Sequence, residues 1–354
     1  MKSVRDNIPA GGKIRVLVVD DSALMRRMIS RIFESEPSVE LVGTACDGFD
    51  ALLKIEQFKP HLVTLDVEMP GLDGIDTLRK IMERHAGVRV IMLSSLTEQG
   101  AQITIDALMH GASDYVTKPA KDGYEQLAVE LLFKVRQFFP RSGNNGFAAE
   151  PVARTPVAAT RRIPPEICAI GVSTGGPSAL VEALPMIPKS FPLPIVIVQH
   201  MPPMFTQMLA ARLDSVCQIP VVEGEDGMII EPGHAVIAPG GFHMRVVKSG
   251  RDLAIRLDEG ERENSCRPAV DVLFRSIVES MNGRAIAAVL TGMGQDGLIG
   301  AQQLKAHGAT ILAQDQASSV VWGMPGAIVA ANLADAVLPL GDIVPEILQR
   351  IGCR

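Results

Sequence analysis

Apolar residues recur along this chain with two different spacings. Short runs rich in Val, Ile and Leu, such as 14–19 and 167–171, are followed by longer segments in which apolar positions return every three or four residues. Runs of the first kind are typical of buried strands, and segments of the second kind are typical of helices that pack on a sheet. Their regular alternation predicts an α/β protein in which helices cover both faces of parallel sheets.

The first stretch of alternation covers residues 14–136. It predicts strands at 14–19, 39–45, 61–65, 89–93 and 112–117, and helices at 23–34, 48–57, 74–84, 102–110 and 124–138. Residues 140–164 follow; they are rich in Pro, Ala and Gly and show little periodicity. Such a segment cannot bury a core, so we expect a flexible linker there.

The alternation resumes after the linker and continues to the end of the chain. Strands are expected at 167–171, 194–199, 234–238, 284–290, 309–313 and 336–338, and helices at 178–186, 206–215, 269–281, 297–307, 326–331 and 343–351. A hairpin is expected at 243–257, where SGRD supplies the turn. The pattern therefore predicts two doubly wound parallel-sheet domains, residues 1–139 and 165–354, joined by the linker at 140–164.

Composition narrows the class of protein. The chain has 354 residues, enough for two domains, and its net charge of −6 without a long Lys/Arg run argues against a nucleic-acid partner. The five cysteines are scattered and form no CxxC pair, which favours reduced thiols over disulfides or zinc ligands. The first residues lack the apolar core of a signal peptide, and no apolar run approaches the roughly 20 residues of a membrane span. We expect a cytoplasmic protein without direct membrane insertion.

Acidic residues follow two of the predicted strands in the first domain. Asp20 and Asp21 come after the first strand, and Asp66 comes after the third. The carboxyl ends of neighbouring parallel strands converge on one crevice, where three carboxylates would repel one another unless they shared a cation. Oxygen ligands of this kind suit Mg²⁺. Ser94 and Lys118 follow the next two strands, and their hydroxyl and ammonium groups suit a phosphoryl group bound to a carboxylate.

Four segments of this domain resemble the marks of response-regulator receiver domains: VLVVDDS, LVTLDVEMPGLDG, VIMLSSL and DYVTKP. The resemblance covers roughly residues 14–136 and implies a flavodoxin-like fold. It implies that Asp66 accepts a phosphoryl group. It also implies a magnesium site made by Asp20, Asp21, Asp66 and the backbone carbonyl of Glu68.

The same resemblance assigns roles to three further residues. Ser94 and Lys118 would contact the phosphoryl oxygens, and Tyr115 would be the aromatic switch residue. It does not say what the receiver regulates. The second domain is too large and too rich in strands for a helix-turn-helix module, so an enzyme is favoured over a DNA-binding domain.

The stretch GVSTGG, residues 171–176, follows the first strand of the second domain and allows three interpretations. Glycines after a strand can cradle a phosphate, a serine between glycines can be a nucleophile, and the stretch can be a simple tight connection. It lacks the Lys-Ser/Thr of a P-loop and the full GxGxxG spacing of a dinucleotide site. The stretch by itself does not decide between these interpretations.

Three reactive residue types follow three different predicted strands of this domain. Ser173, His200 and Asp296 could meet at one sheet edge and form a relay, in which the histidine removes the hydroxyl proton and the carboxylate orients the imidazole. Asp296 could also serve only as a helix N-cap. The chain order Ser…His…Asp differs from that of α/β-hydrolases. The amide of Met293, in TGMG, is a candidate donor to an oxyanion.

A second set of segments resembles the catalytic domain of the chemotaxis protein-glutamate methylesterases. They are AIGVSTGGPSAL, IVIVQHMPPMFTQMLAARL, VIAPGG, CRPAVDVLF, VLTGMGQDG and VWGMPGAI. The resemblance covers nearly all of residues 165–350 and implies a Rossmann-like domain in which Ser173, His200 and Asp296 are the triad. Thr174 and Met293 match accessory catalytic positions.

The two resemblances together imply a regulated hydrolase. Its substrates would be glutamate γ-methyl esters on the cytoplasmic helices of chemoreceptors, and certain receptor glutamines would be deamidated. A chemotaxis histidine kinase would be the phosphodonor, and the receiver would inhibit the catalytic domain until Asp66 is phosphorylated. Ester hydrolysis would need no cofactor. The alternative is a phospho-regulated binding protein with a catalytically weak hydrolase domain. A transcription factor is disfavoured because the net charge of the chain is negative.

Overall fold

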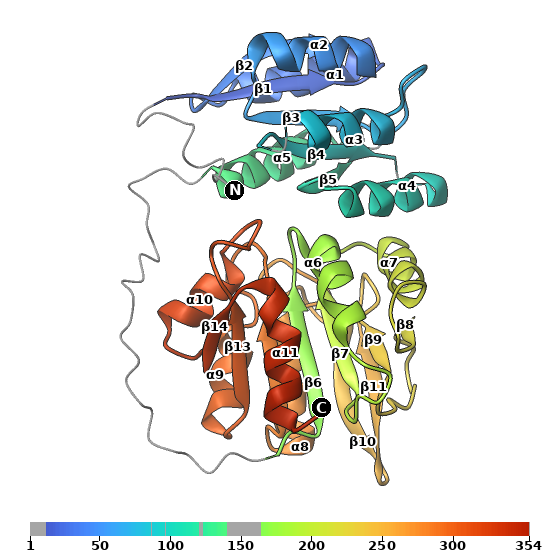
Figure 1. Cartoon of the computed structure of the whole chain (residues 1–354), viewed down its shortest axis with the longest axis vertical. Helices are drawn as coiled ribbons and strands as arrows, with labels where there is room; N and C mark the ends of the chain where they lie inside the picture. Colours follow the sequence, from blue (N-terminus) through green and yellow to red (C-terminus); the bar gives the residue numbers. More distant parts are fainter. Residues whose placement is uncertain (1–11, 86, 96, 120–122, 140–163, 354) are drawn as a thin grey trace. The chain divides into compact units, whose positions relative to one another are not determined.

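A computed structural model of the chain describes residues 12–85, 87–95, 97–119, 123–139 and 164–353 (Figure 1). The chain divides into two compact units after residue 145. The predicted linker, 140–164, lies outside the described residues except for its last position. No helix in the described part of the chain is long and apolar enough to span a membrane.

The first unit is built on a five-stranded sheet. Every pairing in it is parallel, and the strand order is β2-β1-β3-β4-β5. The strands are β1 (Ile14–Val19), β2 (Val39–Ala45), β3 (Leu62–Asp66), β4 (Arg89–Ser94) and β5 (Asp114–Thr117). Strand β3 is buried along its whole length, because helices cover both faces of the sheet.

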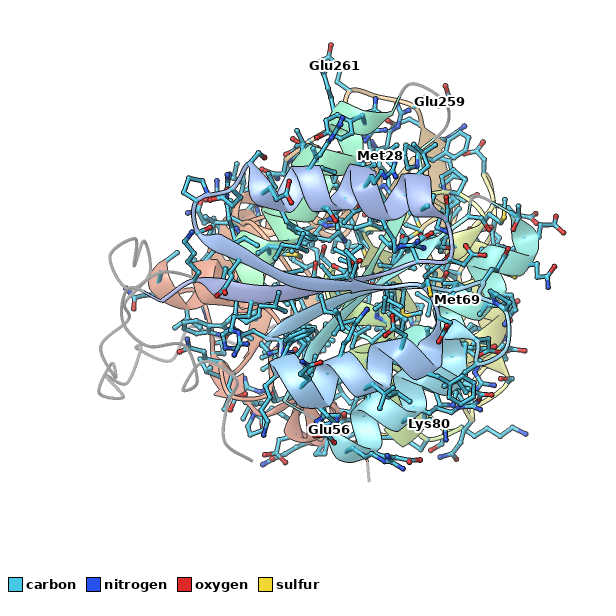
Figure 2. All side chains as sticks on the ribbon, turned by 90° about the horizontal axis from the view of Figure 1, so that it is seen from above. Met28, Glu56, Met69, Lys80, Glu259 and Glu261 are labelled. Atoms are coloured by element: carbon cyan, nitrogen blue, oxygen red, sulfur yellow. The ribbon has the colours of Figure 1, made fainter. Side chains whose placement is uncertain are left out.

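Five helices cover this sheet. They are α1 (Ala23–Glu34), α2 (Gly48–Phe58), α3 (Gly74–Arg84), α4 (Glu98–Met109) and α5 (Tyr124–Phe138). Figure 2 shows α1, with Met28, on one side of the strands, and Glu56 of α2 and Lys80 of α3 on the other. Contacts pair α1 with α5 and join α2, α3 and α4 in series, which confirms the doubly wound arrangement expected from the sequence.

The ends of these helices depend on polar side chains that satisfy free backbone amides. Helix α4 begins at Glu98, four residues before the predicted start at 102, because Thr97 Oγ1 accepts a hydrogen bond from the Gly100 amide at 3.0 Å. Asp47 and Asp73 cap α2 and α3 in the same way. Capping therefore sets boundaries that apolar periodicity alone does not mark.

The second unit contains a larger, seven-stranded parallel sheet. Its strand order is β14-β13-β12-β6-β7-β9-β8. The strands are β6 (Ile167–Val172), β7 (Ile195–Gln199), β8 (Val221–Glu223), β9 (Ala235–Ile237), β12 (Ala285–Val289), β13 (Thr310–Gln314) and β14 (Ala336–Leu338). The sequence analysis did not predict β8, a strand of three residues at one edge of the sheet.

Helices form a layer on each face of this sheet (Figure 1). One layer holds α6 (Gly176–Ala183), its 3-10 extension η2 (Leu184–Met186), α7 (Phe205–Asp214) and α11 (Leu340–Ile351). The other holds α8 (Val270–Met281), α9 (Leu298–Ala306), α10 (Met324–Ala330) and the antiparallel hairpin of β10 (His243–Ser249) and β11 (Asp252–Asp258). The hairpin was predicted at this place. Its residues Met244 and Val246 pack with Phe274 of α8 in the core.

Both sheets reverse their strand order beside their first strand. In the first unit β1 lies between β2 and β3, and in the second unit β6 lies between β12 and β7. Doubly wound sheets bind ligands at the carboxyl ends of strands where this reversal occurs. The side chains that follow β1, β3, β6, β7 and β12 therefore lie where such sheets bind ligands.

Candidate functional site

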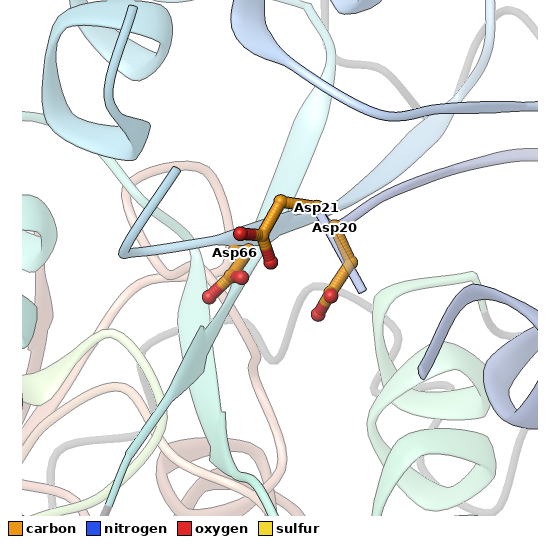
Figure 3. Close-up of side chains that lie close together, drawn as sticks. All are labelled: Asp20, Asp21 and Asp66. Carbon is orange, nitrogen blue, oxygen red and sulfur yellow. The ribbon is translucent and has the colours of Figure 1, made fainter. Parts of the chain in front are cut away.

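The first unit carries an acidic cluster where its strand order reverses (Figure 3). Carboxylate oxygens of Asp20, Asp21 and Asp66 lie within 4.8 Å of one another. Asp20 and Asp66 are buried, with 0% and 2% of their surfaces exposed. The sequence predicted that these three residues meet, and the structure brings them together.

One cation lies against this cluster. Lys118 Nζ is 2.7 Å from Asp66 Oδ2 and 3.1 Å from Asp20 Oδ2. Burial raises the pKa of Asp66 to about 6, since the bond from Lys118 only partly offsets burial and the Asp20 charge adds to the rise. Three carboxylates facing one ammonium group leave negative charge that a divalent cation with a preference for oxygen would neutralise. The residues present therefore fit Mg²⁺.

Glu68 lies beside the same group, since its amide donates to Asp66 Oδ1 at 3.3 Å. Ser94 is placed differently. Its fully buried hydroxyl accepts a hydrogen bond from Thr104 Oγ1 at 2.6 Å and lies 3.2 Å from the Gly100 carbonyl oxygen. Among the described residues it makes no hydrogen bond to Asp66. The structure thus joins Lys118 to the predicted phospho-acceptor but leaves Ser94 bound to helix α4.

Tyr115 lies on β5 with its ring buried. The ammonium group of Lys134 lies 5.5 Å from the ring centroid and forms an ion pair with Asp114 at 2.8 Å. A cation at this distance from an aromatic face is attracted to it. These contacts hold the tyrosine ring in an inward position.

In the second unit, GVSTGG forms the turn between β6 and α6. The Ser173 amide donates to the Thr291 carbonyl at 3.0 Å, and the Gly176 amide donates to the Ser173 carbonyl at 2.8 Å. Gly175 has φ +76°, a conformation that side chains other than glycine's rarely adopt. Ser173 is half-buried at this turn, so part of the residue is accessible to a ligand.

Gly292, in TGMG, packs directly against the serine. A methyl group added there would lie 2.8 Å from Ser173 Cβ and 2.4 Å from Met324 Sδ, so only glycine fits. The next residue, Met293, is half-buried, and its amide donates to no acceptor among the described residues; the same holds for the amide of Thr174. Two backbone donors beside Ser173 are therefore available to an oxygen atom of a ligand.

His200 and Asp296 form a hydrogen-bonded pair. His200 Nε2 and Asp296 Oδ2 are 2.7 Å apart. Val172 and Gln199 are register partners on β6 and β7, so Ser173 and His200, which follow them, lie at neighbouring strand ends. The other imidazole nitrogen, Nδ1, is 3.5 Å from Cys266 Sγ. Within the described chain, no hydrogen bond joins Ser173 Oγ to His200.

Asp296 accepts hydrogen bonds from several groups besides the histidine. The amides of Val270, Asp271 and Gly297 donate to it at 2.6, 3.1 and 3.0 Å, and Asn264 Nδ2 donates at 3.0 Å. The first two amides begin helix α8, so the carboxylate lies at a helix N-terminus that favours negative charge. The sequence suggested that Asp296 could cap the helix that follows it, but its capping bonds go to the start of α8.

These hydrogen bonds shift the pKa values of both His200 and Asp296. Burial would raise the pKa of Asp296, but the bonds from His200 and the α8 amides outweigh it and hold the pKa below its usual value. Burial likewise opposes protonation of His200, but the bond to Asp296 and the contact with Cys266 raise its pKa to about 10. The hydrogen bond to Asp296 thus favours the protonated imidazole, and the donors around Asp296 favour its carboxylate form.

Sequence reasoning missed the group that links Asp296 to a second buried carboxylate. Asn264 Nδ2 also donates to Asp271 Oδ2 at 3.0 Å. Asn264 and Ser265 have φ 52° and 65°, and Glu263 and Cys266 exchange backbone hydrogen bonds across them, as in a two-residue hairpin. An Asn-Ser pair could have suggested a turn, but nothing local indicates that this turn reaches Asp296.

Two further residues near the site have structural contacts. Thr174 is buried, and its carbonyl accepts a hydrogen bond from Thr291 Oγ1 at 2.9 Å. Arg267 donates to the carbonyls of Glu259 and Gly260 at 2.6 and 2.9 Å. The guanidinium group thus holds the neighbouring loop.

Comparisons with known proteins find relatives of both units. A family model described as CheB methylesterase matches residues 168–347, and a model described as response regulator receiver domain matches residues 16–128. A protein-glutamate methylesterase/protein-glutamine glutaminase of Trichodesmium erythraeum is 47% identical over 96% of this chain and 99% of its own length. A protein of the same name from Thermotoga maritima is 43% identical over 96% of this chain and 98% of its own length.

A solved structure resembles the second unit. The crystal structure of the Thermotoga maritima CheB methylesterase catalytic domain has 43% sequence identity and a TM-score of 0.51, and it covers 53% of this chain and 99% of that chain. The resemblances drawn from the sequence are confirmed. The chain belongs to the family of protein-glutamate methylesterases/protein-glutamine glutaminases, in which a response-regulator receiver domain precedes a CheB methylesterase domain.

Proposed function

We propose that this chain hydrolyses γ-methyl esters of glutamate on the cytoplasmic helices of chemoreceptors, releasing methanol, and deamidates receptor glutamines by the same acyl chemistry. The observation that supports this most directly is the 2.7 Å hydrogen bond between His200 and Asp296 at the strand ends beside Ser173. A histidine oriented by a buried carboxylate next to a serine is the arrangement that activates a hydroxyl nucleophile.

The reaction proceeds through an acyl-enzyme. Ser173 Oγ attacks the ester carbonyl as neutral His200 takes the hydroxyl proton. The nitrogen available for this is Nδ1, since Nε2 is bound to Asp296. The tetrahedral intermediate then collapses, and methanol leaves with the proton from the imidazolium. Water repeats the attack on the acyl-serine and returns the free glutamate; from a glutamine the leaving group is ammonia.

Backbone amides stabilise the negative oxygen of the intermediate. The amides of Thr174 and Met293 have no acceptor among the described residues and flank Ser173. The glycine at position 292 keeps the second amide close to the serine, because any side chain there would collide with it. Donors fixed in place before the reaction are worth most in such a site, since they need no reorganisation.

Phosphorylation of Asp66 controls this activity. Mg²⁺ would be held by Asp20, Asp21, Asp66 and the backbone carbonyl of Glu68, and its charge allows an anionic phosphoryl group to approach the carboxylates. Lys118 is already bound to Asp66 and would contact the phosphoryl oxygens. Ser94 would join them after leaving Thr104, and Tyr115 would report the change as the switch residue. A chemotaxis histidine kinase supplies the phosphoryl group, and the receiver inhibits hydrolysis until it arrives.

The experiment that tests the reaction is methanol release from methylated receptor by the wild type and Ser173→Ala. The alanine variant should lose several powers of ten in rate, of the order of 10⁶-fold, while it keeps its fold by circular dichroism. Methanol release at the wild-type rate from the variant would show that Ser173 is not the nucleophile. Receptor binding without methanol release by the wild type would support a regulated binding protein instead.

The regulatory proposal has its own measurement. A small-molecule phosphodonor with Mg²⁺ should raise methanol release by the wild type and leave Asp66→Asn unchanged. Removal of residues 1–145 should raise the basal rate, because the inhibiting domain is gone. A truncated chain that is less active than the full chain, together with no response to the phosphodonor, would exclude inhibition by the receiver.

A further inference from the structure

Two buried glutamines end strands on either side of the reactive serine. Gln199 is the last residue of β7 and Gln314 is the last residue of β13, and their exposed fractions are 2% and 0%. A buried amide side chain is costly unless it is hydrogen-bonded, so its partners indicate its purpose. Neither residue takes part in the chemistry described above.

The side chain of Gln199 joins the turn of the nucleophile to the strand of the base. Its Nε2 donates to the Ser173 carbonyl at 2.9 Å and lies 3.2 Å from the His200 carbonyl oxygen. The amide lies so close to the turn that a methyl group added to Gly176 would be 1.9 Å from Gln199 Oε1. One side chain thus contacts the backbone of both reacting residues.

The side chain of Gln314 binds the backbone of the second loop, TGMG, which begins at Thr291. Its Oε1 accepts a hydrogen bond from the Thr291 amide at 2.7 Å, and its Nε2 donates to Ser318 Oγ at 3.2 Å. Thr291 begins the TGMG loop, which carries Gly292 against Ser173 and then Met293. The carbonyl of Thr291 in turn accepts from the Ser173 amide at 3.0 Å.

The strand order explains why two glutamines are needed. Strand β7 adjoins β6, and β13 adjoins β12, so each glutamine reaches the loop that leaves the neighbouring strand. We propose that Gln199 and Gln314 are positioning residues for ester hydrolysis, the first acting as a donor that fixes Ser173 relative to His200 and the second as an acceptor that fixes the loop carrying the Met293 amide. This rests on the proposed function, because it takes Ser173 as the nucleophile.

The two glutamines differ in the atom that does the positioning, and this gives a sharp test. Glutamate has nearly the same shape as glutamine but offers only acceptors when ionised. Gln314→Glu keeps the acceptor for the Thr291 amide, whereas Gln199→Glu loses the donor to the Ser173 carbonyl. Both positions are almost fully buried, so the costs of burying the new carboxylate are similar. A role in filling space alone predicts that the two variants behave alike.

The experiment measures kcat and KM for methanol release with the full chain. Gln199→Glu and Gln199→Met should lower kcat about 10²-fold, the scale expected for a misplacement of about 1 Å, with KM nearly unchanged. Gln314→Met should lower kcat by a similar factor, and Gln314→Glu should keep it within about tenfold of the wild type. Gln303→Met, at an exposed position on α9, is the matched control and should leave both constants unchanged.

Each outcome bears on the proposal. Equal kcat losses in the two glutamate variants, a kcat unchanged by Gln199→Met, or a rise in KM alone would overturn it. The comparison of the glutamate variants remains decisive where a methionine variant fails to fold. Labelling of Ser173 by a fluorophosphonate separates this proposal from the proposed function: slower labelling of Gln199→Met supports positioning even where the wild type releases no methanol.

Discussion

Asp66 and Asp296 are both buried carboxylates at the carboxyl edge of a parallel sheet, but their surroundings are opposite. Asp66 has Lys118 and one long bond from the Glu68 amide, and two other carboxylates lie beside it. Asp296 accepts bonds from His200, Asn264 and the amides of Val270, Asp271 and Gly297. The oxygen atoms of Asp66 have few donors and can accept further bonds. Those of Asp296 are occupied by several donors, one of which is His200.

The pKa directions express the same difference. Burial raises the pKa of Asp66 to about 6, because its few donors do not offset the loss of water. The pKa of Asp296 is lowered despite burial, because His200 and the start of α8 hold its charge. The number of hydrogen-bond donors around a buried carboxylate thus decides whether its pKa is raised or lowered.

The largest effect is expected from removing the charge of Asp296. Asp296→Asn keeps the shape but cannot stabilise the imidazolium, so kcat for methanol release should fall about 10⁴-fold. Asp271→Asn is the control, because Asp271 is buried beside Asp296 but does not contact His200, and its loss should be far smaller. Equal losses in the two variants would mean that the acidic pair acts as a whole and that Asp296 has no special role.

An intermediate effect is expected from pH. In the proposed reaction, proton transfer from Ser173 needs neutral His200, and the hydrogen bond to Asp296 raises the pKa of the imidazole to about 10. Below that pKa the neutral fraction grows about tenfold per pH unit, so kcat/KM should rise from pH 6 upward. The rate is measured against Ser173→Ala, which corrects for alkaline hydrolysis of the ester. A flat profile above pH 7 would show that His200 is already neutral in the resting enzyme.

The smallest effect is expected from the amide that lies between the two carboxylates. Asn264→Ala removes one of several donors to Asp296, so kcat should fall by about tenfold or less, in line with about 1 kcal/mol for one hydrogen bond. Burial raises the pKa of Asp271 to about 6, and the charge of Asp296 contributes to this rise. The bond from Asn264 lowers this pKa, so the loss of stability between pH 5 and pH 8, measured by thermal unfolding, should be larger in the variant than in the wild type. A kcat loss as large as that of Asp296→Asn would contradict the view that the α8 amides dominate.

Much of the fold could be predicted because it depends on local patterns. Buried parallel strands give continuous apolar runs, and the expected and observed bounds agree within a residue or two for most strands. Helix starts were less predictable: α4 begins at a cap, and α11 begins at Leu340, three residues before the expected start. At both ends a backbone amide donates to a side-chain hydroxyl, Gly100 to Thr97 and Leu340 to the distant Ser318, and neither bond is visible in the apolar pattern of the helix.

The residues of the two sites also differ in how well the sequence could place them. Residues in the segments that follow strands, such as Asp20, His200 and Asp296, could be placed at one sheet edge because the topology brings strand ends together. Asn264 and Gln314 could not, because they reach the site across a hairpin or from a neighbouring strand. The state of a side chain is also hidden from the sequence: Ser94 is at the expected strand end, but its hydroxyl is bound to Thr104.

Trp322 gives the second unit a spectroscopic reporter at a useful place. It is the chain's single tryptophan, its indole Nε1 donates to the Gln314 carbonyl at 3.0 Å, and its backbone pairs with Gly292 beside Ser173. Its emission wavelength depends on that hydrogen bond and on the polarity around the ring. Excitation of tryptophan alone would therefore follow the loop beside the serine during turnover, without any label attached to the protein.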